Sequence, residues 1–185
     1  MTTMTADLTS RLAEDLDGAF PDLVRELSSG LYSGALRMLG DHHEAEEVAQ
    51  DAFVRAYRAL QGYPAQRIRE LRLRGWVWTI AANLCRNRIR SRARRPTGSF
   101  DGIDPPERGD GPEAIAISTE SVGQLAAQLL GLPWEMRTAV VLKHVVGLSY
   151  DEISDALDRP RGTVRSDVSR GLARLRSALH REEER

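Results

Sequence analysis

Arginine, tryptophan and asparagine residues are concentrated in one short part of the chain, where they could bind nucleic acid. Residues 67–95 hold ten arginines and one acidic residue, Glu70, a net charge of +9. Arginine pairs with phosphate through its planar guanidinium, and tryptophan or asparagine can stack on or hydrogen-bond to unpaired bases. Because so positive a segment repels itself without a nearby anion, we predict that it contacts a polyanion. Its candidate side chains are Trp76, Trp78, Asn83, Arg86, Asn87, Arg88, Arg90, Arg92, Arg94 and Arg95.

A second group of basic and hydroxyl side chains lies on a helix predicted near the end of the sequence. Residues 148–157 predict a short helix with a capping box made by Ser149 and Glu152. A turn follows, and a longer helix begins at residue 161, the pattern of a helix-turn-helix. At about 100° per residue, the longer helix turns apolar side chains inward and small hydroxyls with arginines outward, which favours reading of the DNA major groove. The solvated basic face of a helical bundle is the alternative. The inward set is Val164, Val168, Leu172, Leu175 and Leu179; the outward set is Ser166, Ser169, Arg170, Ala173 and Ser177, flanked by Arg165, Arg174 and Arg176.

A cluster of acidic and imidazole side chains at residues 41–47 suggests metal binding at first sight. Acidic residues also belong in the first turn of a helix, where they cap free amides and complement the helix dipole, and we favour that interpretation. The sequence has no glycine-rich phosphate loop, no arguable Ser/His/Asp spacing and no set of thiolates. We therefore predict no enzyme activity, no cofactor and no metal site. The single cysteine, Cys85, excludes an intramolecular disulfide and is predicted to be a small buried residue.

Helical periodicity places these residues in an all-α fold. Apolar residues recur at three- and four-residue spacing over 20–39, 45–60 and 72–95. The third of these helices is predicted to turn Trp76, Ile80, Leu84 and Ile89 inward. Residues 96–112 are rich in proline, glycine and acidic residues and predict a flexible linker. Further helices are predicted near 113–131, 134–146, 150–157 and 161–181. The predicted organisation is an N-terminal extension (1–19), a helical domain (20–95), the acidic linker (96–112) and a helix-turn-helix domain (113–181).

The overall charge conceals this organisation. The 185 residues carry a net charge of −1, but residues 1–66 sum to −6, 67–95 to +9, 96–136 to −6 and 137–185 to +2. Separate surfaces are therefore suited to separate partners. Every lysine or arginine except Lys143 is arginine, which fits phosphate recognition and a GC-rich genome equally well. The sequence has neither an apolar run of the roughly 20 residues that cross a bilayer nor a secretory signal, so we expect a cytoplasmic protein without membrane insertion.

With both predicted domains in view, the sequence resembles an extracytoplasmic-function (ECF) sigma factor, a member of the sigma-70 family of bacterial transcription initiation factors. Residues 45–58 resemble the helix with which these proteins dock on core RNA polymerase. Residues 76–90 resemble their promoter-melting helix, and residues 147–153 with 162–166 resemble their helix-turn-helix. The two motif sets occur in the family's order, on either side of the predicted linker.

The resemblance implies a mechanism in which this protein makes and breaks no bond. Its partners would be core RNA polymerase, through the clamp coiled coil and the flap, promoter DNA, and an anti-sigma factor. The residues implied for the polymerase clamp are Gln50, Asp51, Phe53, Arg55 and Arg58. The residues implied for the non-template strand of the −10 element are Trp76, Asn83, Arg86, Asn87 and Arg90. A flipped base of that strand would lie in the loop before Trp76. Those implied for the −35 element, read as duplex, are Arg161, Thr163, Arg165, Ser166, Ser169, Arg170 and Arg174.

Three features depart from the family's usual pattern. Asp167 stands where arginine is common and could pair with Arg170 or Arg174. Asn87 stands where aspartate is frequent, and the loop at 61–75 is longer and more basic than usual. A stand-alone helix-turn-helix regulator with an N-terminal ligand-binding or dimerisation domain is an alternative, but it leaves the arginine-rich helix without a role. A nucleic-acid-processing enzyme is a further alternative, which the lack of a metal or nucleophile constellation disfavours.

Overall fold

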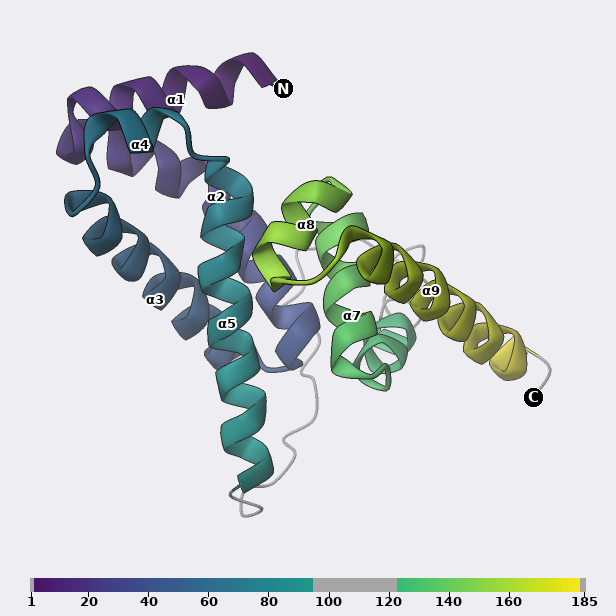
Figure 1. Ribbon diagram of the computed structural model, residues 1–185. Helices are drawn as coiled ribbons and strands as arrows, with labels where there is room; N and C mark the ends of the chain where they lie inside the picture. The colour runs from purple at the N-terminus through teal and green to yellow at the C-terminus, as the bar shows by residue number, and fades with distance from the viewer. Residues whose placement is uncertain (1, 95–122, 184–185) are drawn as a thin grey trace, which may run out of the picture.

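Helices make up the regular structure of the part of the chain that the structure describes, residues 2–94 and 123–183. In this computed structural model, residues 2–94 form a first module and residues 123–183 form a second module (Figure 1). The predicted all-α fold with two helical modules is confirmed. The predicted linker, residues 96–112, and the first part of the helix predicted near 113–131 lie outside the described residues.

The first module is built on three long helices, α2 (Leu16–Leu39), α3 (His42–Gln61) and α5 (Leu73–Arg94). Asp15 and Asp41 cap α2 and α3, because each side chain accepts a hydrogen bond from the backbone N–H three residues later. Gly40, with a φ of +71°, ends α2 in the left-handed conformation that glycine tolerates best. These signals are local in the sequence, so the predicted and observed helix ends agree to within a few residues.

Two further helices of the first module were not predicted, α1 (Thr2–Glu14) and α4 (Ala65–Arg69). α1 lies in the segment that was expected to be an extension, yet Leu8 and Leu12 are 4% and 1% exposed and belong to the core. α1 packs against α2 and α4 (Figure 1), and Ile68 of α4 is buried in the same core. The loop predicted over 61–75 is therefore partly helical and is supported by α1.

The second module contains a helical segment at 123–130, α7 (Trp134–Val140), the π-helical turn η1 (Val141–Val145), α8 (Tyr150–Leu157) and α9 (Arg161–Glu183). The single helix predicted over 134–146 is thus α7 continued by a wider turn. Gly147, with a φ of +80°, ends η1 and lets Leu148 donate its backbone N–H to the carbonyl of Leu142 at 3.0 Å. Ser149 and Glu152 form the predicted capping box of α8.

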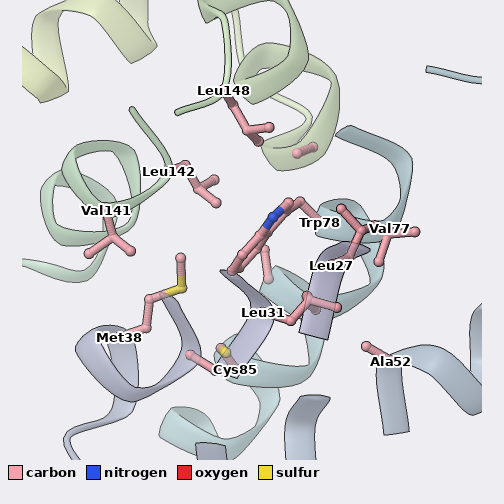
Figure 2. Close-up of a cluster of buried hydrophobic side chains, with 14 of the residues drawn as sticks. Leu27, Leu31, Met38, Ala52, Val77, Trp78, Cys85, Val141, Leu142 and Leu148 are labelled. Carbon is pink, nitrogen blue, oxygen red and sulfur yellow. The ribbon is translucent and has the colours of Figure 1, made fainter. Parts of the chain in front are cut away.

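The two modules pack against each other, which the sequence did not indicate. Trp78 of α5 is 2% exposed. Its indole lies near Met38 of α2 and faces Leu142 and Leu148 of the second module (Figure 2). The buried residues of both modules form one continuous apolar cluster. Burial of aromatic and aliphatic surface of this kind stabilises the packed arrangement. We call this contact the module interface; it is formed by Met38, Arg74, Trp78, Arg137, Leu142, Val146 and Leu148.

Two arginines add hydrogen bonds across the module interface. Arg74 donates from Nη2 to the carbonyl of Val146 at 2.8 Å, and Arg137 donates from Nη1 to the carbonyl of Met38 at 2.7 Å. Burial, together with the nearby guanidinium of Arg92, lowers the pKa of Arg137. Each bond pairs a guanidinium of one module with a backbone carbonyl of the other, so the interface has directional polar contacts as well as apolar ones.

The inward face of α5 differs from the prediction. Of the four residues predicted to face inward, Leu84 is buried, while Trp76, Ile80 and Ile89 are partly buried. The helix contacts α2, α3 and α8, so its buried residues occupy several faces and no single apolar stripe marks the core side. The residues of α5 that are buried are Leu73, Gly75, Val77, Trp78, Ala81, Ala82, Leu84 and Cys85.

Candidate nucleic-acid interface

The arginines of α5 divide into sets with different surroundings. Arg88 and Arg92, about one turn apart, face α3. Arg88 pairs with Glu47 (Nη1 to Oε2, 2.5 Å), and Arg92 pairs with Glu44 (Nη2 to Oε2, 3.0 Å). Arg92 also donates from Nη1 to the carbonyl of Leu39 at 3.0 Å. These two arginines therefore join α5 to α3 and to the end of α2. Their guanidinium groups already have partners within the protein, without an external anion.

The acidic cluster at 41–47 serves these arginines and the start of α3. Asp41 caps the helix, Glu44 and Glu47 pair with α5, and His43 lies 3.6 Å from Glu47 (Nε2 to Oε1). Among residues 2–94 and 123–183, no group of three or more His, Cys, Asp or Glu side chains is placed to hold a metal ion. Asp41 therefore has the capping role that the sequence predicted, while Glu44 and Glu47 also join α3 to α5.

The five side chains predicted to hold unpaired DNA share one stripe of α5. Their spacing of seven, three, one and three residues places them within an arc of about 100° at 100° per residue. This arc lies opposite the arginines that pair with α3. Asn83, Asn87 and Arg90 are exposed, and Trp76 and Arg86 are partly buried. We call this arc the α5 stripe; it consists of Trp76, Asn83, Arg86, Asn87 and Arg90. Trp78 does not belong to it, because it is buried in the module interface.

Tyr63, which the sequence analysis missed, extends the α5 stripe at its N-terminal end. Its ring centroid lies 6.0 Å from that of Trp76. The guanidinium carbon of Arg67, on α4, lies 3.8 Å from the Tyr63 ring centroid, a cation–π contact. A tyrosine four residues before an arginine, in a basic loop, is the signal that could have identified it. Cationic and aromatic groups therefore continue from α4 onto α5.

The outward face of α9 is exposed, as its periodicity predicted. Val164, Val168 and Leu175 are 0%, 2% and 7% exposed and form the inward face. Arg161 pairs with Asp151 of α8 at 3.3 Å (Nη1 to Oδ1) on the surface. Of the side chains predicted to read duplex DNA, Thr163 is partly buried, and Arg161, Arg165, Ser166, Ser169, Arg170 and Arg174 are exposed.

Arg174 differs from the other predicted reading residues in its surroundings. It lines a groove between α9 and the segment at 128–132, with Gln128, Leu132 and Ser177. The remaining reading residues lie closer to the turn between α8 and α9. The structure therefore brings together the residues of the first turns of α9 and places Arg174 at the edge of a separate groove.

A surface on α3 gathers most of the residues predicted to dock on polymerase. Gln50 and Phe53 line a groove between α2 and α3, with Val24 and Tyr32 on its other side. At 100° per residue, Gln50, Asp51, Arg55 and Arg58 lie within an arc of about 140°, and all four are exposed. Val54, which the sequence analysis did not select, lies within this arc and is 48% exposed. We call this surface the α3 face; it consists of Gln50, Asp51, Val54, Arg55 and Arg58, together with Phe53, which is 9% exposed and contributes as a wall of the adjoining groove.

Cys85 has no reactive role in this structure. It is 0% exposed, as predicted for a small buried residue. Burial raises the pKa of its thiol to about 12. The thiolate, which is the nucleophilic form, is therefore scarce at neutral pH.

None of the helices in the described parts of the chain has the length and apolar character needed to span a membrane.

Two basic surfaces on two helical modules, one aromatic and amide-rich and the other on a helix-turn-helix, define a two-module nucleic-acid-binding protein. Comparison with known families agrees with this class. The family description "Sigma-70 region 2" matches residues 23–95, and "Sigma-70, region 4" matches residues 123–175. The chain belongs to the sigma-70 family, in its ECF group, and its function is to direct RNA polymerase to promoters at transcription initiation.

Individual relatives match most of the chain. The ECF RNA polymerase sigma factor SigW of Bacillus subtilis is 35% identical over 172 residues, which cover 87% of this chain and 89% of SigW. The RNA polymerase sigma-H factor of Pseudomonas aeruginosa is 31% identical over 170 residues, 87% of this chain and 86% of that protein. The sigma factor RpoE from Bartonella quintana, solved with the anti-sigma factor NepR, has the same fold, with a TM-score of 0.70 at 22% identity over 87% of this chain and 96% of RpoE.

Proposed function

We propose that the protein binds core RNA polymerase and places it on promoters by two separate DNA contacts. The first module holds the melted −10 element, and the second module reads the −35 element as duplex. The proposed functional boundaries are 20–95 for the first contact and 113–181 for the second, with 96–112 between them. The observation that carries the proposal is the division of arginines on α5, where Arg88 and Arg92 serve the fold and the opposite arc is left for a ligand.

The α5 stripe suits single-stranded DNA. Asn83 and Asn87 present amides that can donate and accept hydrogen bonds, and Arg90 is available for phosphate. Trp76 and Tyr63 offer aromatic rings at the α4 end, where an unstacked base could stack. Binding energy from these groups would offset the few kcal/mol that extrusion of a base from the duplex costs. Asn87, which departs from the family's frequent aspartate, adds no negative charge to this surface.

The outward face of α9 suits the major groove of duplex DNA. Ser166 and Ser169 are small enough to let the helix approach closely, and Arg165 lies on the same exposed arc. Arginine can donate two hydrogen bonds to guanine O6 and N7, and serine can reach base edges or phosphates. The capping box at Ser149 fixes the start of α8, the helix on which the recognition helix packs.

The α3 face is the proposed docking surface for the clamp coiled coil of core polymerase. It combines an exposed apolar side chain, Val54, with charged residues and with a groove that Phe53 and Gln50 line. An apolar centre with a polar rim is the usual composition of a protein–protein interface. Phe53 is held edge-on against Phe20, with ring centroids 6.5 Å apart, so the groove wall is preformed.

The proposed function requires the modules to separate. Elements named −10 and −35 lie about 25 base pairs apart, which is about 85 Å of duplex at 3.4 Å per base pair. In the packed arrangement, Arg86 and Arg90 of the α5 stripe line the same pocket as Arg159 of the second module. A fully extended chain as long as the 28 residues at 95–122 reaches about 90 Å. The module interface must therefore open when both promoter elements are bound.

An anti-sigma protein is a further proposed partner. The sigma factor RpoE, which shares this fold, was solved in complex with the anti-sigma factor NepR. A protein that binds across both modules would hold them packed and would keep the α5 stripe and α9 from reaching separate elements. Because its proposed partners are polymerase and promoter DNA, we assign the protein to the cytoplasm.

A binding experiment distinguishes this function from that of a stand-alone regulator. The full chain, with and without bacterial core polymerase, is mixed with duplex promoter fragments and resolved by native gel electrophoresis. The proposal predicts little retention by the chain alone and a stable complex when core polymerase is added. Specific retention by the chain alone, unchanged by core polymerase, would instead support a stand-alone helix-turn-helix regulator.

A further inference from the structure

Asp167 is a charged residue on the recognition helix that is almost completely buried. It is 3% exposed, whereas Arg165, Ser166, Ser169 and Arg170 around it are exposed. A buried carboxylate is stable only when it is paired, because its transfer from water is costly. Its surroundings therefore decide what it does on a helix that is otherwise suited to DNA.

Two arginines surround the carboxylate of Asp167. Arg159, in the turn before α9, forms an ion pair with it at 2.5 Å (Nη1 to Oδ2). Arg170, one turn later on α9, donates a hydrogen bond from Nη2 to Oδ1 at 2.8 Å. The side chain of Arg159 is 25% exposed and that of Arg170 is 60% exposed. Asp167 therefore engages one arginine that is mostly covered and a second that still reaches solvent.

Arg159 is also fixed through its backbone. Its N–H donates to the carbonyl of Ser154 at 3.1 Å, and the Ser154 hydroxyl donates to the carbonyl of Arg159 at 2.6 Å. Asp158, with a φ of +51°, makes the sharp turn just before it. Arg159 is thus joined to α8 by its backbone and to α9 by its side chain. Through this residue, Asp167 helps to set how the two helices of the helix-turn-helix are held together.

We propose that Asp167 is a positioning residue for −35 recognition, which withholds Arg159 from DNA phosphates and holds Arg170 in one orientation for base reading. The inference rests on the proposed function of the second module. Arginines next to DNA gain free energy from any phosphate within reach, and that gain carries no sequence information. By pairing with both side chains, Asp167 limits this unspecific binding and leaves recognition to the exposed residues of α9.

The test measures the salt dependence of DNA binding by holoenzymes made from the full chain and core polymerase. The probes are a promoter fragment selected by the wild-type holoenzyme from genomic DNA and the same fragment with a scrambled −35 element. Because core polymerase makes its own phosphate contacts with every variant, differences in slope report on the second module. Asp167→Asn is the main variant, since it keeps the shape and removes the charge. Asp158→Asn is the matched control, because it removes the same charge nearby and asparagine tolerates the left-handed conformation.

The proposal predicts that D167N steepens the plot of log K against log salt by about one to two, as one or both released arginines contact phosphate. Affinity for the scrambled fragment should rise, and discrimination between the two fragments should fall. D158N should leave both nearly unchanged. A purely structural role would lower the thermal midpoint and weaken both fragments alike, without a steeper slope. An unchanged or shallower slope in a folded D167N protein would overturn the proposal.

Arg159→Gln keeps the proposal falsifiable if D167N fails to fold. Since Asp167 withholds Arg159 from DNA, R159Q should leave the salt slope unchanged. A slope that becomes shallower by about one would show that Arg159 already contacts a phosphate, and would overturn the proposal. Failure of the wild-type chain to assemble with core polymerase is a different result, because it overturns the proposed function and this inference together.

Discussion

Gly34 of α2 and Trp78 of α5 meet so closely that a Cβ atom at position 34 would lie 2.4 Å from Cη2 of the indole. The same Cβ would lie 3.1 Å from Cγ2 of Val146, in the second module. Gly34 therefore allows the indole to fill the space between the two modules. The module interface depends on the absence of a side chain at this position as much as on the aromatic ring.

Gly34→Ala should destabilise the protein, and Gly30→Ala is its matched control. Alanine gains about 1 kcal/mol over glycine in a helix interior, so G30A, which meets nothing within 4 Å, should be neutral or stabilising. In G34A the methyl group must displace the indole, which costs about 1–3 kcal/mol. Urea denaturation of both variants measures the difference. Equal or greater stability of G34A compared with G30A would show that the indole does not fill this space.

Arg90→Ala and Arg92→Ala remove the same charge from opposite faces of one turn of α5 and should have different effects. R90A should weaken binding of the holoenzyme to a fork-shaped promoter fragment with an unpaired −10 element, while the melting temperature stays near that of the wild type. R92A removes ion pairs to α3 that are partly exposed, so it should cost about 1 kcal/mol of stability and affect the fork less. If both variants weakened the fork complex equally, the assignment of Arg90, and not Arg92, to the DNA-binding surface would be wrong.

Val54→Asp should impair capture of core polymerase, because it places a charge in the apolar centre of the α3 face. Its side chain is 48% exposed, so the substitution should change folding stability by less than about 0.5 kcal/mol. Val145→Asp is the control, since Val145 is 39% exposed but lies in the second module. Co-purification with tagged core polymerase measures capture. Normal capture of V54D would exclude this face as the docking surface.

The pKa of Cys85 predicts a loss of stability at alkaline pH. Burial raises the folded-state pKa of this thiol to about 12, above the usual value of 9.0 for a free thiol. The folded protein therefore keeps a proton that the unfolded chain releases, so this contribution is complete below pH 9 and is lost as the pH rises toward 12. Between pH 8 and pH 10 the thiol should account for a loss of about 1.4 kcal/mol.

Cys85→Ala separates the contribution of the thiol from other effects of alkaline pH on stability. The variant should be less stable than the wild type at pH 8, because it leaves a small cavity. Its further loss between pH 8 and pH 10, measured by urea denaturation, should be smaller than that of the wild type by about 1.4 kcal/mol. Parallel pH curves for the two proteins would contradict the burial of a protonated thiol.

The elements that the sequence predicted well are those with local signals. Asp41 at the start of α3, Gly40 at the end of α2, and Ser149 with Glu152 at the start of α8 each fix a helix end through neighbouring residues. Periodicity predicted the outward face of α9 correctly, because the apolar residues of that helix lie on one side and only that side packs inward. Local chemistry of this kind needs no knowledge of the rest of the fold.

The features that the sequence did not predict depend on distant residues. Whether Trp76 or Trp78 is buried depends on the second module, which supplies Leu142 and Leu148 to the space beside α5. The division between Arg88 and its neighbours depends on Glu47, 41 residues earlier in the chain. α1 carries few apolar residues, so its sequence does not show that it packs into the core; only the folded structure does. Pairings of this range are set by tertiary packing and leave no periodic trace.

Transcription from promoter DNA by purified components tests the central claim most directly. Core polymerase alone, and core polymerase with the full chain, are supplied with nucleotides and a library of genomic promoter fragments, and the 5′ ends of the RNA are mapped. The account predicts that the chain adds start sites at a defined set of fragments that share two elements at constant spacing. RNA that starts at the same places and in the same amounts with core polymerase alone would contradict it.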